Sequence, residues 1–169
     1  MRSVLPIYRE SFFVSPFRDD GLKLEAIYED HLVWTDMSVD TRYEGYESVV
    51  HGALVFGVMD VLIWYVIFME TQKICMTRTA EMEYLKPVMC DTTYRARARV
   101  DRVEGRDTYA SAWVEDAEGE TYARVSVVFR EAKGLDYADF VSKLDFRKCE
   151  PWVEEHFHAA VKAWRQGQG

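Results

Sequence analysis

Asp60 is the residue of this sequence best suited to chemistry. It is the only charged side chain in the apolar run ALVFGVMDVLIWYVIFM, residues 53–69. A carboxylate among apolar side chains is costly to ionise, so its pKa rises toward the range in which it can exchange protons at neutral pH. We therefore expect Asp60 to act as a general base or a nucleophile. The alternative is a structural carboxylate that pairs with a buried donor or faces water at a subunit interface.

His51 and Gly52 stand immediately before this run. The first N–H groups of a helix have no intrahelical partner and lie at the positive end of the helix dipole, which suits a developing oxyanion. A glycine there lets a ligand approach the backbone closely. Taken alone, this pair is as typical of an ordinary helix start as of a catalytic site.

The spacing of His51 and Asp60 has a geometric consequence. At about 100° and 1.5 Å per residue, nine residues place Asp60 on the opposite side of the helix and about 13 Å along its axis. One helix cannot easily direct both residues at one small reacting group. A twofold dimer can, with the Gly52 end of one chain facing Asp60 of the other. We therefore expect a homodimer or a dimer of dimers.

Other polar residues carry weaker signals. Thr77 begins the strand after the apolar run, where its hydroxyl could hold a water or orient a carboxylate, although a β-branched residue is equally typical of a strand. Alternating arginines at 95, 97 and 99 share one strand face, and acidic residues at 115 and 116 are expected to balance them in water. The cysteines and the other histidines lack ligand-type spacing, so we expect no metal.

The elements that position these residues begin with the apolar run. It is short for a membrane span and carries a charge at its centre, so we expect a helix over about 52–70 that is buried on all sides of a soluble protein. The chain has 21 Lys and Arg against 29 Asp and Glu. This acidic balance argues against nucleic acid as a partner. No signal peptide is evident near the start, and a cytoplasmic location is expected.

Alternating patterns predict the strands. We expect a pair turning near residues 29–30 within 22–39, then strands over 74–86, 92–103, 108–117 and 121–131, with hairpins at 104–107 and Gly119. In strand 74–86, Ala80, Met82 and Tyr84 face one way and Thr77 the other. Residues 1–20 and 40–52 are expected to be irregular, and helices follow Gly134. One domain is expected, with an α+β fold: a curved antiparallel sheet around a central helix, its core at about 17–130 and a helical extension at about 135–166.

The stretch from Tyr43 to Pro87 resembles the hot-dog-fold acyl-CoA thioesterases, specifically their phenylacetic-acid-type (PaaI-like) branch. Members carry a loop close to GYPGIVHGG, an Asp nine residues after the His, and then a strand ending in Y-x-[KR]-P. This chain has GYESVVHGA at 45–53, Asp60, and YLKP at 84–87. The resemblance covers roughly residues 17–130 and implies the hot-dog fold.

The resemblance implies a role for each matching residue. Asp60 matches the carboxylate that activates water or attacks the thioester, and Gly52 matches the residue whose N–H contributes the oxyanion hole. His51 matches a His near the thioester carbonyl, and Thr77 matches a Thr of some members. The family acts on acyl-CoA across a dimer, and the resemblance implies neither a metal nor a cofactor besides the CoA of the substrate.

Departures from the family pattern concern substrate binding. Ala53 replaces the second Gly of His-Gly-Gly, Glu-Ser replaces Pro-Gly at 47–48, and bulky side chains up to Trp64 follow Asp60. We expect Ala53, Trp64 and Tyr46 to contact the substrate, in a narrowed or rerouted acyl pocket. The departures also keep open a non-catalytic acyl-CoA-binding protein. A hydratase or dehydratase is a further alternative, which would need His51 as a second acid or base.

Overall fold

A seven-stranded antiparallel sheet wraps around one long helix in the computed structural model, which describes residues 1–167. The strands follow the order β1-β3-β4-β8-β9-β10-β7 across the sheet. Their bounds are Arg2–Val4 for β1, Ile27–Glu29 for β3, Leu32–Met37 for β4, Cys75–Tyr84 for β7, Tyr94–Glu104 for β8, Asp107–Glu115 for β9 and Thr121–Glu131 for β10. The expected α+β architecture of a curved sheet around a central helix is confirmed.

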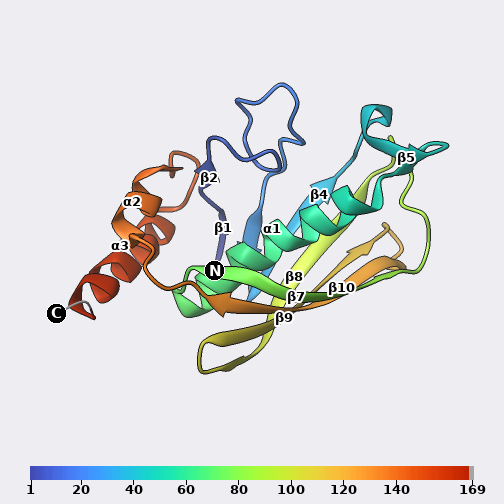
Figure 1. Cartoon of the computed structure of the whole chain (residues 1–169). Coiled ribbons are helices and arrows are strands. Elements are labelled where there is room, and N and C mark those ends of the chain that lie inside the picture. The colour runs from blue at the N-terminus through green and yellow to red at the C-terminus, as the bar shows by residue number, and fades with distance from the viewer. Residues whose placement is uncertain (168–169) are drawn as a thin grey trace.

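Helix α1, Gly52–Thr71, lies across one face of this sheet (Figure 1). Buried alanines in the two central strands face it, at positions 96 and 98 of β8 and 110 and 112 of β9. Ala98 and Ala112 are direct cross-strand partners. Small side chains in the sheet leave room for the large ones of the helix, such as Met59, Leu62 and Phe68, which are fully buried. This packing fixes the height of α1 above the sheet.

One side of α1 is only partly covered, so the expectation of a helix buried on all sides is wrong for the single chain. Ala53 is exposed, and Phe56, Gly57, Asp60 and Trp64 are only half-buried. By length and composition α1 could cross a membrane, yet it packs against the sheet with ten side chains buried. The exposed parts of this side are therefore open to a partner.

Two segments expected to be irregular contain short strands. β1 adds to the main sheet beside β3, and β2, Ile7–Tyr8, pairs with β11, Leu144–Asp145. Between β4 and α1 the chain forms the short helix η1, Thr41–Tyr43, and a hairpin of β5, Glu44–Tyr46, and β6, Val49–Val50. These strands have two or three residues each, which is too few for an alternating pattern to reveal.

The hairpins fall where the sequence predicts them. Asp30 and His31 turn between β3 and β4, both with positive φ, and Gly105 and Gly119 turn at the next two hairpins. β3 is shorter than expected because residues 22–26 pair elsewhere. The Leu24 N–H donates to the carbonyl of Phe13 at 2.8 Å, which ties this stretch to the N-terminal segment.

The C-terminal extension is helical, as predicted. It consists of α2, Tyr137–Ser142, and α3, Pro151–Gln166, and both lie beside the C-terminal half of α1 (Figure 1). The buried Phe157 of α3 stacks on Phe68 of α1 with ring centroids 4.2 Å apart. Phe140 of α2 packs against Trp64, with ring centroids 5.3 Å apart. The extension therefore covers the far end of α1 and leaves its Gly52 end free.

Candidate functional site

Asp60 lies half-buried on α1 beside the edge strand β7. The Thr77 hydroxyl donates a hydrogen bond to its Oδ1 at 2.7 Å. Burial raises the pKa of Asp60 above the ordinary value of 3.8, and the bond from Thr77, which favours the ionised form, partly opposes this shift. The carboxylate keeps a second oxygen, Oδ2, free to accept a proton. It is thus oriented and poised as a base.

A β-bulge places Thr77 at this carboxylate. Thr79 pairs with Val128 and Thr77 pairs with Phe129, so Arg78 is an extra residue that has no partner of its own in β10. Because Phe129 is buried under α1, Thr77 faces the helix, on the same side as Ala80. The prediction that Thr77 faces away from Ala80 is therefore wrong. Strict alternation fails here because a bulge changes the phase by one residue.

His51 caps the start of α1. Its Nδ1 accepts a hydrogen bond from the Ala53 N–H at 3.0 Å, so a neutral ring carries its hydrogen on Nε2. The Gly52 N–H has no hydrogen-bond partner among residues 1–167. Since the ring is exposed, two donors are available at the helix start: the Gly52 N–H and the His51 Nε2–H. Together they can polarise a carbonyl oxygen.

Tyr84 packs against the same helix start. Its hydroxyl donates to the carbonyl of Gly52 at 2.8 Å. A Cβ at Gly52 would lie 3.1 Å from the Tyr84 ring, so the glycine serves this close packing as well as any ligand. An open groove of about 400 Å³ borders the pair, lined by Val49, Val50, Gly52, Val55, Tyr84, Leu85, Lys86, Pro87 and Val88. The sequence does not predict this contact, although Tyr84 belongs to the Tyr-x-Lys-Pro motif.

Along one chain, the Asp60 carboxylate and the Gly52 amide belong to different parts of α1. Asp60 lies eight residues after Gly52, about 12 Å along the axis, and only Thr77 of the predicted catalytic residues is bonded to it. Ala53 is exposed next to Gly52. Tyr46 is 71% exposed on the β5–β6 hairpin, and Trp64 packs within the chain against Phe140. The candidate residues thus form two half-sites, at Asp60 and at Gly52.

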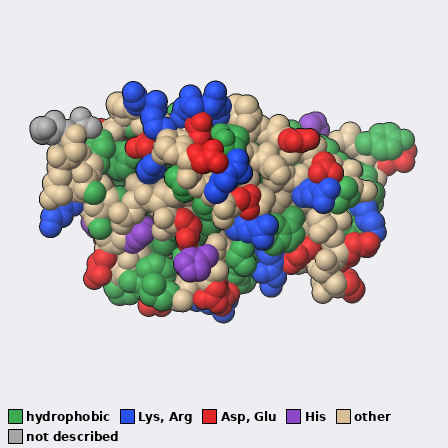
Figure 2. Space-filling model, turned by 90° about the horizontal axis from the view of Figure 1, so that it is seen from below, with side chains coloured by type: hydrophobic (Ala, Val, Ile, Leu, Met, Phe, Trp, Pro, Cys, Tyr) green, Lys and Arg blue, Asp and Glu red, His purple; other side chains and the backbone are tan. Residues whose placement is uncertain are grey.

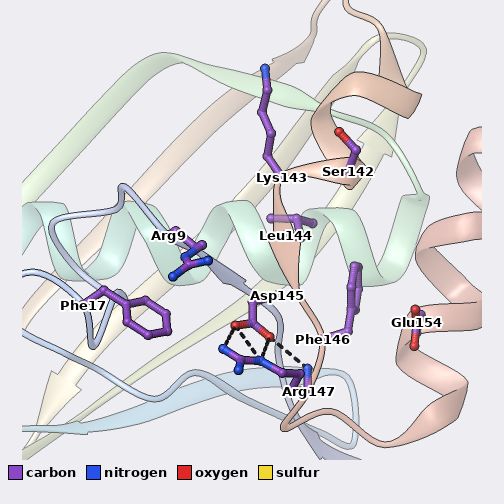
Figure 3. A pocket seen from close by; sticks show the side chains of 9 residues that line it. All are labelled: Arg9, Phe17, Ser142, Lys143, Leu144, Asp145, Phe146, Arg147 and Glu154. Carbon is purple, nitrogen blue, oxygen red and sulfur yellow. Dashed lines mark hydrogen bonds and ion pairs between the residues drawn. The ribbon is translucent and has the colours of Figure 1, made fainter.

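A second groove, of about 650 Å³, lies between the N-terminal segment and the C-terminal extension (Figure 3). Arg147 forms a bidentate ion pair with Asp145 inside it, and Lys143 pairs with Asp139. Arg147 lowers the pKa of Asp145 to about 2, so this carboxylate is too weak a base for proton transfer at neutral pH. Asp145 in this groove is therefore not a candidate general base.

The arginines of β8 pair with acidic neighbours, as predicted, but of the two expected partners only Glu115 takes part. Arg95 binds Asp36, Arg97 binds Glu115, and Arg99 binds Asp101. Figure 2 shows the molecule from below, where clusters of Lys and Arg alternate with clusters of Asp and Glu. Within residues 1–167, no group of three or more His, Cys, Asp or Glu side chains is arranged to hold a metal ion.

The segment that holds these residues is similar to a known protein family. Residues 47–123, which contain His51, Gly52, Asp60 and Thr77, match the family model of the thioesterase superfamily. The match covers slightly less than half of the chain's 169 residues. The predicted resemblance to hot-dog thioesterases is thereby confirmed, and the sheet around α1 is the hot-dog fold.

Solved structures share this hot-dog fold. A thioesterase-superfamily protein aligns with a TM-score of 0.67 and 18% identity over 73% of this chain and 61% of its own. The PaaI protein of the Escherichia coli phenylacetic acid degradation operon aligns with a TM-score of 0.61 and 16% identity over 67% and 82%. A Streptococcus mutans protein bound to acetyl-CoA aligns with a TM-score of 0.57 and 16% identity over 62% and 84%. No functionally curated protein matches the sequence. At these identities the structural likeness concerns the fold.

Proposed function

We propose that this protein is a homodimeric thioesterase that hydrolyses an acyl-CoA to the free acid and CoA, in the manner of the PaaI-like branch. The observation that carries the proposal is Asp60, a charged side chain on an otherwise apolar helix, oriented by Thr77 and left half-open. A carboxylate with a purely structural role would be stabilised more by a buried cationic partner than by one hydroxyl. The acetyl-CoA bound to the Streptococcus mutans protein supports the class of substrate.

Asp60 supplies the base in this reaction. Its Oδ2 takes a proton from a water molecule while the water oxygen attacks the thioester carbonyl carbon. The carbon–sulfur bond then breaks, and the CoA thiolate takes the proton from the protonated Asp60. Direct attack by the carboxylate, with later hydrolysis of the anhydride, uses the same geometry. In both routes the raised pKa of Asp60 makes the carboxylate a stronger base than an exposed aspartate.

The Gly52 N–H stabilises the oxyanion. It has no hydrogen-bond partner among the described residues and lies at the positive end of α1, where charge on the carbonyl oxygen develops during attack. His51, with its hydrogen on Nε2, can donate to the same oxygen. Ala53 in place of a glycine does not remove either donor, since the Ala53 N–H already caps onto His51.

A second copy of the chain brings the two half-sites together. β7 is the last strand of the sheet, so its outer edge carries free backbone groups. Tyr84 at one end of β7 touches Gly52, and Thr77 at the other end touches Asp60. If two β7 strands pair antiparallel about a twofold axis, the Tyr84 end of one lies beside the Thr77 end of the other. Each Asp60 then faces the Gly52 of the second chain, as the spacing along α1 requires.

The test is thiol release from a panel of acyl-CoA esters, with wild type beside Asp60→Asn. We expect release that falls by about 10²–10⁴-fold in Asp60→Asn, the usual contribution of a general base. Glu70→Gln is the matched control, because Glu70 lies on the same helix but bonds to Tyr28 and His31 at its far end. Saturable binding of the esters without hydrolysis would instead identify an acyl-CoA-binding protein.

A further inference from the structure

The N-terminal segment covers α1 next to the proposed active site. Residues 9–24, here called the cover segment, precede the thioesterase-superfamily match at 47–123. Backbone hydrogen bonds fix the cover segment: the Leu22 N–H donates to the Phe12 carbonyl at 2.9 Å, and the Leu24 N–H donates to the Phe13 carbonyl at 2.8 Å. The Ser11 hydroxyl also accepts the Phe13 N–H. Phe13 is therefore held at a defined position.

Phe13 lies directly on Gly57 of α1. A Cβ built on Gly57 would lie 2.3 Å from Cζ of the Phe13 ring, far inside van der Waals contact. No other residue type leaves room for the ring in this position. Phe12 packs edge-on against Phe13 with ring centroids 5.2 Å apart, and it contacts Tyr43 on its other side. The glycine and the ring thus form a matched pair.

Gly57 is a near neighbour of Asp60 on the same side of α1. Three residues correspond to about 4.5 Å along the axis and about 60° around it. Four residues after Asp60 comes Trp64, which stacks on Phe68 and packs against Phe140 of α2. Along α1, Asp60 therefore lies between Gly57, which the Phe13 ring covers, and the aromatic Trp64. The first ring comes from the cover segment, and the second is backed by the C-terminal extension.

We infer that Phe13 is a specificity-determining residue that limits the acyl group to short chains. The inference rests on the proposed function and adds the substrate class to it. An acyl group held with its carbonyl at Asp60 meets the Phe13 ring on one side and Trp64 on the other. Short acyl-CoA esters fit between the rings, whereas longer chains require Phe13 to move.

The experiment compares kcat/KM for acetyl-, butyryl-, octanoyl- and lauroyl-CoA in wild type and Phe13→Ala. Wild type is expected to prefer the two short esters. Phe13→Ala raises the ratio of kcat/KM for octanoyl-CoA to kcat/KM for acetyl-CoA by about tenfold or more, because a single methylene group in an apolar pocket changes kcat/KM by at least about tenfold. Phe17→Ala is the matched control, because Phe17 belongs to the cover segment but is 51% exposed and stacks with Arg9. It leaves the ratio unchanged.

Gly57→Ala is a second variant, which acts without removing the ring. Its new methyl group displaces Phe13, so the octanoyl-to-acetyl ratio changes in the same direction as in Phe13→Ala. Wild-type ratios in both variants, with native unfolding transitions, would overturn the role of Phe13. If wild type hydrolyses no ester, the proposed function fails. In that case, the Kd values of non-hydrolysable acyl-CoA thioethers of the same chain lengths are compared in wild type, Phe13→Ala and Gly57→Ala. If both variants bind the chain lengths with the same preference as wild type, the role of Phe13 is overturned independently of the proposed reaction.

Discussion

At the scale of single residues, two opposing effects decide the state of Asp60. Burial among apolar side chains favours the neutral acid, and the hydrogen bond from Thr77 favours the carboxylate. Burial has the larger effect, so the pKa of Asp60 is raised. A base needs both a high enough pKa to accept a proton and a large enough ionised fraction to be present. We therefore expect Thr77 to orient Asp60 and to favour its ionised form.

Thr77→Val tests this balance. Valine keeps the β-branched shape of threonine but removes the hydroxyl, so the ionised Asp60 loses its donor and its pKa rises further. Activity depends on the carboxylate, and the acidic limb of the kcat/KM profile consequently moves to higher pH. The measurement is a profile of thiol release between pH 4 and pH 9 in both proteins. An acidic limb that stays at the wild-type pH would show that Thr77 has no such role.

At the scale of elements, the bulge in β7 and the alanine surface beneath α1 set the site geometry. The bulge at Arg78 turns Thr77 toward the helix, and the small side chains of β8 and β9 let α1 lie close to the sheet. The depth at which Asp60 sits beside β7 depends on both features. A change in either one alters the site without touching a catalytic group.

Ala112→Leu tests the alanine surface. The side chain is buried between β9 and α1, so the larger leucine overpacks the core and lowers the free energy of unfolding by about 1–3 kcal/mol. Ser126→Leu, at an exposed position on the other face of β10, is the control and changes it by about 0.5 kcal/mol or less. Urea denaturation measures both. Equal stability of the two variants would contradict close packing of α1 on the sheet.

The long elements could be predicted from the sequence, and the short ones could not. The apolar run gives α1 to within a residue, and alternating patterns give β8, β9 and β10 because each strand has one buried face. β1, β2, β5 and β6 have at most three residues each, and tertiary contacts decide them. The bulge at Arg78 leaves no mark in the residue types. Consequently Asp60 and Gly52 could be proposed as site residues from the sequence, but the orientation of Thr77 could not be predicted.

The spacing of residues along the sequence does not predict contacts between distant segments. The contact between Tyr84 and Gly52 joins a strand end to a helix start, and the Phe13 ring reaches Gly57 from a segment far away in the chain. A glycine in an apolar helix is the only trace of the second contact in the sequence. The reason for Gly57 is its contact with the Phe13 ring, which forms only when the cover segment folds over α1.

At the scale of the whole molecule, the single chain leaves part of an apolar helix side and a sheet edge uncovered. Met76 and Tyr84 on β7 are 64% and 56% exposed, so large apolar side chains also reach solvent along this edge strand. Both features lie beside the half-sites. The proposed dimer covers them in one step and completes two active sites.

Ala80→Lys tests the proposed dimer. Ala80 lies between Thr77 and Tyr84, near the expected twofold axis, so the variant brings two ammonium groups together across the axis. We expect monomers by sedimentation equilibrium and a parallel loss of thioesterase activity. Val103→Lys is the control, because Val103 is 45% exposed at the end of β8, away from that edge. A dimeric and active Ala80→Lys protein would contradict pairing through β7.

The final test depends on a variant that removes only the Gly52 N–H. Gly52→Pro suits the fold because proline is favoured at the first helical position, and the ψ of 128° at His51 is compatible with a following proline. The loss of an oxyanion donor lowers kcat by about 10²–10³-fold. Gly52→Ala keeps the N–H while adding the same Cβ beside Tyr84, so it separates the loss of the donor from crowding.

The most direct measurement mixes Asp60→Asn and Gly52→Pro chains after joint unfolding and refolding. Each variant alone is nearly inactive. In a mixed dimer, the intact Asp60 of one chain faces the intact Gly52 of the other, so a statistical mixture recovers about a quarter of wild-type thiol release. That recovery would establish a thioesterase site shared by two chains. A mixture no more active than its parents, although mixed dimers form, would contradict it.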